Sequence, residues 1–290
     1  MPRARILSRG EALELNSTMT SVDYSIPPVR HRIAITATVT KVRRLSPLMQ
    51  RLTFKASEFV GQEAISCADT YMKIVLPDPT NSDEPVMRSY TVRSHDSVAG
   101  TVDIDFALHG QGGVAAPWAE RAQVGDTAEF KGIGGGYNPS AQAPWHLLIG
   151  DDSALPAIAA AVEQLGEDSG KVVILIADSP EELLGDGDAF SPPEGSEVQV
   201  VSHTPAVIEA VRSAYASHEG VPHVFLHGEA SMVREVRRVI RSDFAQDLKA
   251  MSVSGYWRAG ASDERWREMK RDWSRGVEAD EAKLAGVSTS

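Results

Sequence analysis

The stretch that decides the fold is residues 87–93, which read Met87-Arg88-Ser89-Tyr90-Thr91-Val92-Arg93. In a strand, alternation sends Arg88, Tyr90 and Val92 to one face and the residues between them to the other. An arginine can hold a diphosphate bidentately, a tyrosine ring can lie against a flat heterocycle, and a hydroxyl group can hydrogen-bond a ring nitrogen. A bound flavin needs all three groups, although the heptapeptide alone is more simply an ordinary barrel strand with a surface arginine and tyrosine.

A second segment, residues 103–119, strengthens the flavin hypothesis. A strand-like run ends in a glycine-rich turn, and this turn leads into a helix start made of small residues. Free backbone amides in such a turn can bind phosphate. The histidine of this turn is flanked by leucine and glycine, and we assign it to cofactor contact instead of proton transfer. The predicted flavin-binding residues are Arg88, Ser89, Tyr90, Thr91, Asp105, His109, Gly112, Gly113, Ala115, Ala116 and Trp118.

With these motifs in place, the chain resembles the siderophore-interacting protein family, the flavin-dependent ferric-siderophore reductases built like a ferredoxin reductase. The resemblance includes the two segments above and further blocks at 148–157, 227–238 and 254–260, in the order of the family. Two departures stand out. Val114 replaces a usual proline, and the glycine-rich run 132–136 replaces a turn of the Gly-Pro-Arg-Gly type, which removes a basic residue beside the flavin mouth.

The resemblance implies a two-domain ferredoxin-reductase-like fold, with an antiparallel β-barrel that binds FAD followed by a parallel-sheet α/β domain that binds NAD(P)H. It also implies that NADH or NADPH reduces FAD and that reduced FAD passes electrons singly to a ferric siderophore, from which ferrous iron leaves. Two alternatives stay open: a broader flavin-dependent reductase, or a non-enzymatic siderophore-binding module with structural FAD. The sequence distinguishes neither NADH from NADPH nor one siderophore class from another.

Composition limits the partners of the chain. Its 290 residues are long enough for two domains, and a net charge of -11 disfavours nucleic acid and anionic membranes as partners. The single cysteine, Cys67, excludes an internal disulfide and, without a CxxC pair, a thiolate metal or iron–sulfur site. We find no signal-peptide pattern and no bilayer-spanning stretch. We therefore expect a cytoplasmic monomer whose iron arrives chelated by its own small-molecule ligand, with no metal held by side chains.

The pattern along the chain predicts four segments. Residues 1–30 lack a sustained period and end in two prolines, so we expect a mobile or loosely packed extension. Residues 31–143 form the FAD-binding domain, where strands at 33–42, 50–55, 71–76, 88–94, 101–109 and 127–133 predict a closed antiparallel barrel with a helix at 114–121. Residues 144–276 form the NAD(P)H-binding domain, and residues 277–290 are expected to be a flexible tail.

Residues 144–276 alternate apolar strands with helices, which predicts a parallel sheet. We expect strands at 146–149, 172–176, 198–201, 223–226 and 251–253 and helices at 154–165, 205–216, 231–244 and 263–275. Ser153 and Ser231 are the expected N-caps. On the last predicted helix, Trp266 and Trp273 lie seven residues apart, and we expect them to pack against the sheet.

Ligands of open parallel sheets bind beyond the carboxyl ends of the strands. The NAD(P)H candidates are therefore Gly150, Asp151, Asp152 and Ser153 after the first strand, Gly228 and Glu229, by resemblance, after the fourth, and Tyr256, Trp257 and Arg258 after the last. Because two carboxylates would repel phosphate, we expect the nicotinamide end beside the aspartates. Trp257 can lie over the flavin face, or it can be a core residue with Arg258 in a salt bridge.

Cations around the flavin mouth would attract an anionic ferric siderophore despite the acidic chain. The candidates are Lys41, Arg43, Arg51, Lys73 and Lys131, each of which can equally be a solvated surface charge. The glycine-rich run 132–136 lacks GxGxxG spacing, so we interpret it as a flexible turn between the domains and not as a dinucleotide fingerprint.

Overall fold

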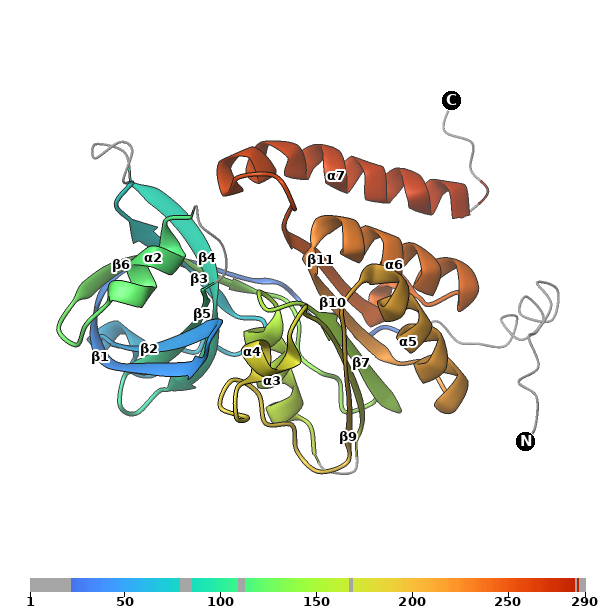
Figure 1. Cartoon of the computed structure of the whole chain (residues 1–290), viewed down its shortest axis with the longest axis horizontal. Helices are drawn as coiled ribbons and strands as arrows, with labels where there is room; N and C mark the ends of the chain where they lie inside the picture. The colour runs from blue at the N-terminus through green and yellow to red at the C-terminus, as the bar shows by residue number, and fades with distance from the viewer. Residues whose placement is uncertain (1–21, 79–84, 109–112, 167–168, 285, 287–290) are drawn as a thin grey trace.

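The computed structural model describes residues 22–78, 85–108, 113–166, 169–284 and 286. These residues form a β-barrel and an α/β unit that stand side by side (Figure 1). Six antiparallel strands close the barrel in the order β1-β2-β5-β4-β3-β6, and five parallel strands form the second sheet in the order β11-β10-β7-β8-β9. The predicted barrel and the predicted parallel sheet are both confirmed.

Apolar side chains at alternating positions of the barrel strands fill its interior. Phe54, Phe106 and Phe130 are fully buried there, and the rings of Phe54 and Phe130 meet edge to face with centroids 4.9 Å apart. The predicted helix contributes Ala115 and Ala119 to the same core. The elements are β1 (Val29–Ser46), β2 (Met49–Lys55), β3 (Tyr71–Leu76), β4 (Val86–Asp96), β5 (Thr101–Ala107), α2 (Ala115–Arg121) and β6 (Thr127–Gly135).

The parallel sheet carries helices on both faces, with α3 and α4 on one and α5 and α6 on the other (Figure 1). The chain runs outward through β7, β8 and β9 and then returns to place β10 on the other side of β7. This reversal puts the ligand-binding switch point between β7 and β10. The elements are β7 (Trp145–Gly150), α3 (Leu155–Gln164), β8 (Gly170–Ile176), α4 (Pro180–Leu184), β9 (Ser196–Val201), α5 (Thr204–Ser217), β10 (His223–Glu229), α6 (Ala230–Asp243), β11 (Met251–Trp257) and α7 (Asp263–Leu284).

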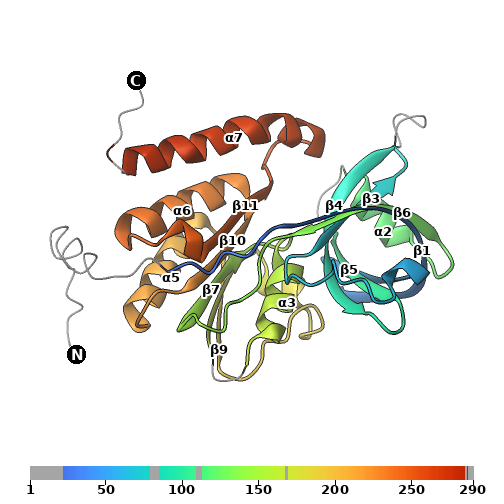
Figure 2. The ribbon, with the colours of Figure 1, turned by 180° about the vertical axis from the view of Figure 1, so that it is seen from behind.

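The described part of the N-terminal segment, residues 22–30, is not the loose extension that we expected. Tyr24 is buried, its backbone N–H donates to the carbonyl of Lys249 at 3.0 Å, and its ring centroid lies 5.0 Å from that of His223. Figure 2 shows this segment running along the α/β unit before it enters the barrel as β1. The apolar ring of Tyr24 holds the segment there, a contact that sequence periodicity does not reveal.

The last helix continues beyond residue 275, so the first part of the expected flexible tail is helical. In Figure 1, α7 lies along α6 with its N-terminal end toward the barrel. Glu281 pairs with Arg237 at 2.9 Å and with Arg241 at 2.7 Å. As predicted, the tryptophans of α7 face the sheet: Trp266 is buried against β11, and Trp273 donates to the carbonyl of Ala230 at 2.9 Å.

Two local expectations are wrong. Most of the glycine-rich run belongs to strand β6, where Gly134 pairs with Tyr71, and a Cβ on Gly134 would lie 2.5 Å from the tyrosine ring. Glycine therefore allows a close approach inside a sheet and forms no hinge. The helix starts also differ, because Glu229 caps α6 by accepting the N–H of Ser231, and α3 follows Ala154 with no side-chain cap from Ser153.

We predict that Glu281→Ala lowers the free energy of unfolding by about 1–3 kcal/mol, because it leaves two arginines of α6, one of them buried, without their shared carboxylate. Urea unfolding followed by circular dichroism measures the change. Asp272→Ala breaks only an exposed pair with Arg275 and serves as the control, with no measurable loss expected. Equal losses in the two variants would contradict the role given to Glu281.

Candidate active site

A cavity of about 500 Å³ lies where the barrel, the carboxyl edge of the parallel sheet and the start of α7 meet. Strands β3, β4 and β5 and helix α2 form its barrel wall, and the ends of β7 and β11 form its sheet wall. A hollow of about 470 Å³ between β9 and α5 is distant from both predicted cofactor motifs and holds none of their residues. We therefore place the candidate site in the first cavity.

The barrel wall holds the motif with which the sequence analysis began. Arg88, Ser89, Tyr90 and Thr91 all line the cavity, although strict alternation would send them to two faces. These residues pair with β3 in unbroken register, from Arg88 opposite Ile74 to Thr91 opposite Tyr71, and the register shift in the ladder with β5 comes only after them, between Val92 and Ser94. Both faces of this strand segment therefore border the cavity.

Tyr90 is held by the barrel core. Its ring centroid lies 4.4 Å from that of Phe106, and burial raises the pKa of its phenol, which stays neutral. Trp118, a predicted flavin contact, instead packs in the barrel core, with its ring 5.9 Å from Phe106 and 6.4 Å from Phe54. It does not line the cavity, so we remove it from the candidate cofactor residues.

Small residues complete this wall. The predicted residues Gly113, Ala115 and Ala116 line the cavity and leave room for a ligand to approach the backbone. His109 and Gly112, which were predicted with them, lie outside the described residues. The side chains of the barrel wall thus fit a flavin, with a cation for its diphosphate, an aromatic face and hydroxyl groups for its ring, and little bulk opposite.

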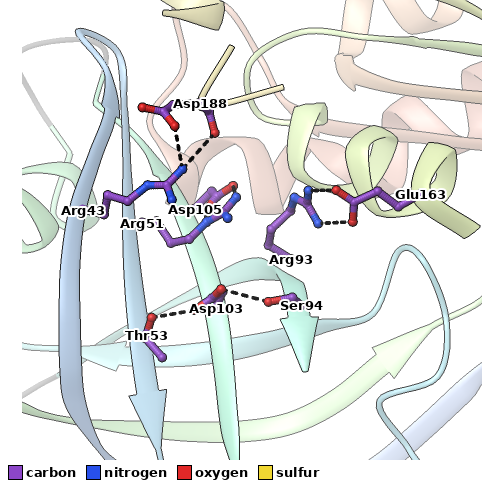
Figure 3. A network of polar contacts seen from close by, with 9 residues as sticks. All are labelled: Arg43, Arg51, Thr53, Arg93, Ser94, Asp103, Asp105, Glu163 and Asp188. Atoms are coloured by element: carbon purple, nitrogen blue, oxygen red, sulfur yellow. Dashed lines mark hydrogen bonds and ion pairs between the residues drawn. The ribbon is translucent and has the colours of Figure 1, made fainter. Parts of the chain in front are cut away.

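Asp105 also lines the cavity, and Arg51 is its counter-ion. Its carboxylate accepts two hydrogen bonds from Arg51, at 2.6 and 2.7 Å (Figure 3). Asp105 is only 4% exposed, so the pair neutralises a charge that burial would otherwise penalise. Arg51 is therefore committed to Asp105, and the structure does not support its predicted role in substrate binding.

The other predicted substrate cations lie apart from the cavity, with one exception. Arg43 pairs with Asp188 at 2.9 Å (Figure 3), Lys131 pairs with Glu129 at 3.2 Å, and Lys41 is exposed on β1. Lys73 alone among the five lines the cavity. The neighbours of Arg43 and Arg51 in the chain gave no indication of this difference, because Asp188 and Asp105, their counter-ions, come from distant segments.

Helix α7 supplies cavity residues that the sequence analysis missed. Asp263, Trp266, Arg267 and Lys270 lie at i, i+3, i+4 and i+7 and share one face of the helix toward the cavity. The same periodicity that predicted a buried tryptophan could have indicated its basic neighbours. Burial lowers the pKa of Lys270, and the nearby Asp263 opposes this shift.

Asp151 organises the sheet wall from behind the cavity surface. Its carboxylate accepts the indole N–H of Trp257 at 2.8 Å, the backbone N–H of Glu229 at 2.8 Å and the backbone N–H of Ser153 at 3.0 Å. Burial, together with the charge of Asp152, raises its pKa to about 6. Three strand ends are therefore joined through one carboxylate.

The glycines of this region serve packing. Gly228 has a φ of +135°, and a Cβ there would lie 2.6 Å from Oδ2 of Asp151. A Cβ on Gly150 would lie 2.5 Å from the Cβ of Ala154. Glu229 caps α6, so of the predicted residues at these two turns only Asp152 and Ser153 line the cavity.

The end of β11 presents two aromatic residues to the cavity. The hydroxyl of Tyr256 lies 2.8 Å from Nδ1 of His227, and burial lowers the pKa of this histidine to about 3, so its ring is neutral. Trp257 lines the cavity, is half-buried and is anchored by its indole N–H, so it is no core residue, and its place over the flavin stays a prediction. Arg258 donates to the hydroxyl of Ser231 instead of forming the expected salt bridge.

Two absences concern the described residues only. No group of three or more His, Cys, Asp or Glu side chains in them is arranged to hold a metal ion. In the same part of the chain, no helix combines the length and the apolar character that crossing a membrane requires.

Comparison with known families agrees with this geometry. Residues 79–137 match the siderophore-interacting FAD-binding domain, and residues 143–260 match the siderophore-interacting protein model. The chain belongs to the siderophore-interacting protein family. The first matched region contains the parts of the barrel wall formed by β4, β5 and α2, and the second contains the sheet wall.

Individual relatives place the family assignment in context. An uncharacterised protein of Mycobacterium tuberculosis is 36% identical over 271 residues, 81% of this chain and 93% of that protein. Ferric vibriobactin reductase ViuB of Vibrio cholerae is 29% identical over 202 residues, 68% of this chain and 72% of that protein. The siderophore-interacting protein SipS from Aeromonas hydrophila has a TM-score of 0.70 and 26% identity over 84% of this chain and 99% of that one. Ferredoxin reductases at 13% to 15% identity share the fold alone and confirm the ferredoxin-reductase-like architecture.

We predict that Trp257 fluorescence titrates with a midpoint near pH 6, because protonation of Asp151 weakens the bond to the indole N–H. The pKa of Asp151 is raised in the folded state, so its contribution to stability is complete below the ordinary value of 3.8 and is lost as the pH rises through about 6. The signal should disappear in Asp151→Asn and in Trp257→Phe. A midpoint that persists in Asp151→Asn would show that another group titrates.

Proposed function

We propose that this protein is a ferric-siderophore reductase that uses FAD and NAD(P)H and releases ferrous iron from the chelate in the cytoplasm. The observation that carries the proposal is the single cavity in which a flavin-type motif, a nicotinamide-type sheet edge and a basic helix face meet. The family membership and the similarity to a ferric vibriobactin reductase support it. Fold similarity to ferredoxin reductases supports the nicotinamide partner.

Four residues of β4 would hold the flavin. Arg88 would bind the diphosphate, Tyr90 would present its ring face to the isoalloxazine, and the hydroxyls of Ser89 and Thr91 would hydrogen-bond ring heteroatoms. When bound, FAD supplies hydride acceptance from a dihydronicotinamide and single-electron transfer to ferric iron. The barrel residues therefore bind and orient, and no protein acid or base is compulsory.

The sheet wall would position the nicotinamide. Ser153 and the aromatic pair of Tyr256 and Trp257 line the cavity opposite the barrel motif. Tyr256 is fixed by His227, and Trp257 is fixed by Asp151, so neither ring has to be ordered when the ligand arrives. Their apolar faces would also exclude water from the space between the two walls.

The substrate would enter on the side of α7. Lys73, Arg267 and Lys270 line the cavity, and Lys270, which is half-buried, would attract an anion more strongly than the two exposed cations. The acidic surface of the chain as a whole would keep nonspecific anions away, whereas these cations would favour an anionic ferric chelate locally. The iron would stay bound to its own chelator throughout.

The proposal predicts two separable half-reactions under anaerobic conditions. The FAD-loaded protein should lose its yellow colour with NADH or NADPH, and mixing with ferric siderophores in a stopped-flow instrument should restore it. A ferrous trap such as ferrozine reports the reduced iron. If neither nicotinamide bleaches the flavin, a non-enzymatic binding module is the better description. Equal rates with ferric chelates, quinones and other generic acceptors would favour a broader reductase.

We predict that Lys270→Met raises KM for an anionic ferric chelate by roughly threefold to tenfold, because one partly desolvated charge is lost from the entrance. A neutral hydroxamate chelate and the anaerobic reduction of FAD by nicotinamide should be unaffected. Lys249→Met, which removes an exposed lysine paired with Asp23, is the matched control. Equal effects on charged and neutral chelates would argue for a packing role of Lys270.

A further inference from the structure

The first turn of α7 lies against the arginine that the proposed flavin site requires. Nη2 of Arg88 donates to Oε1 of Glu264 at 2.6 Å, and Nη1 lies 3.2 Å from Oδ2 of Asp263. Nη1 also donates to the carbonyl of Met87 at 3.1 Å. The Arg88 side chain is 13% exposed, so both terminal nitrogens already have carboxylate partners in a largely enclosed position.

The charges of this cluster balance without any ligand. Asp263 also pairs with Arg267 at 2.9 Å, so two arginines face two carboxylates. A flavin diphosphate carries two negative charges, and it would enter beside two carboxylates that already balance the two arginines, with Lys270 as a further cation near Asp263. Bidentate binding to Arg88 would need the Nη2 N–H that Glu264 accepts and would bring the phosphate oxygens to the side where Asp263 forms its ion pair with Nη1. Diphosphate and carboxylates are therefore alternative partners.

We propose that the carboxylates of Asp263 and Glu264 compete with the flavin diphosphate for Arg88. Docking of the first turn of α7 on the barrel and binding of FAD therefore exclude each other. The inference rests on the flavin site proposed above. It gives the last helix a second task besides lining the substrate entrance, because its first turn sets the affinity for the cofactor.

The first turn of α7 can leave the barrel while the rest of the helix stays in place. Its barrel contacts include the two carboxylates on Arg88 and a hydrogen bond from Arg267 to the carbonyl of Met87. Glu264 is 55% exposed and can turn into water at little cost. The far part of α7 is held independently by the pairing of Glu281 with α6 and by the hydrogen bond of Trp273. Trp266 is buried against β11 and stays in place, so only Asp263, Glu264 and the side chain of Arg267 need to move.

The test compares FAD binding to flavin-stripped wild type and to Asp263→Asn/Glu264→Gln, with the dissociation constant read from quenching of flavin fluorescence. Removal of the competing carboxylates should tighten FAD binding roughly fivefold or more. Glu264→Gln alone should give part of this gain. Glu268→Gln, which changes an exposed acid of the same helix paired with Arg265, should leave the dissociation constant unchanged. Arg88→Ala should weaken FAD binding at least tenfold.

Hydrogen exchange gives an independent readout. Addition of FAD to the wild type should speed exchange of the backbone amides in residues 263–265, because the carboxylates leave Arg88, and the double variant should exchange fast there without FAD. Two results would overturn the proposed competition between carboxylates and diphosphate while leaving the flavin site intact. One is unchanged or weaker FAD binding in the double variant, and the other is slower hydrogen exchange of this turn when FAD is bound. Failure of every variant and of the wild type to bind FAD would overturn the flavin site and this inference together.

Discussion

One buried carboxylate sets the shape of the site. Asp151 accepts hydrogen bonds from Ser153, Glu229 and Trp257, which belong to the ends of three different strands. Gly228 lets the carboxylate come this close, because any side chain there would collide with it. The geometry of the sheet wall therefore depends on satisfying a charge that burial disfavours, and the raised pKa of Asp151 is the cost of that arrangement. The aromatic face of the cavity follows from it, since an anchored Trp257 stands beside Tyr256.

Periodicity predicted the architecture because the two halves bury their side chains in different ways. Barrel strands have one face in the core and one in water, so they alternate, whereas parallel strands covered on both faces are continuous apolar runs. The motif at Arg88 also predicted a flavin site, because few ligands need a cation, an aromatic ring and hydroxyl groups from one strand. Alternation did not predict that all four residues of this motif line one cavity, because both faces of the strand segment border it.

What the sequence could not reveal was which charges cancel. Arg51 and Lys73 looked alike as candidates, yet Arg51 meets Asp105, 54 residues away, while Lys73 lines the cavity. Likewise, Arg88 meets Glu264, 176 residues away. The first pairing depends on the register of β2 and β5 and the second on how the two units pack, and local pattern carries no information about either. The same limit applies to the terminal segments, because Tyr24 and Glu281 are ordered by distant partners and not by the periodicity of their neighbours.

Among the ties between the barrel and the α/β unit, two that start from β4 differ in character. On one side, Arg93 of β4 forms a bidentate salt bridge with Glu163 of α3 (Figure 3), and α3 packs directly on β4. On the other side, Arg88 of the same strand meets the first turn of α7. The Arg93 pair does not line the cavity, whereas Arg88 does, so a ligand can compete for the second tie only. Binding of the diphosphate would therefore separate the barrel from the first turn of α7 and leave the contact between β4 and α3 in place. The contact with α3 would keep the two walls of the site aligned.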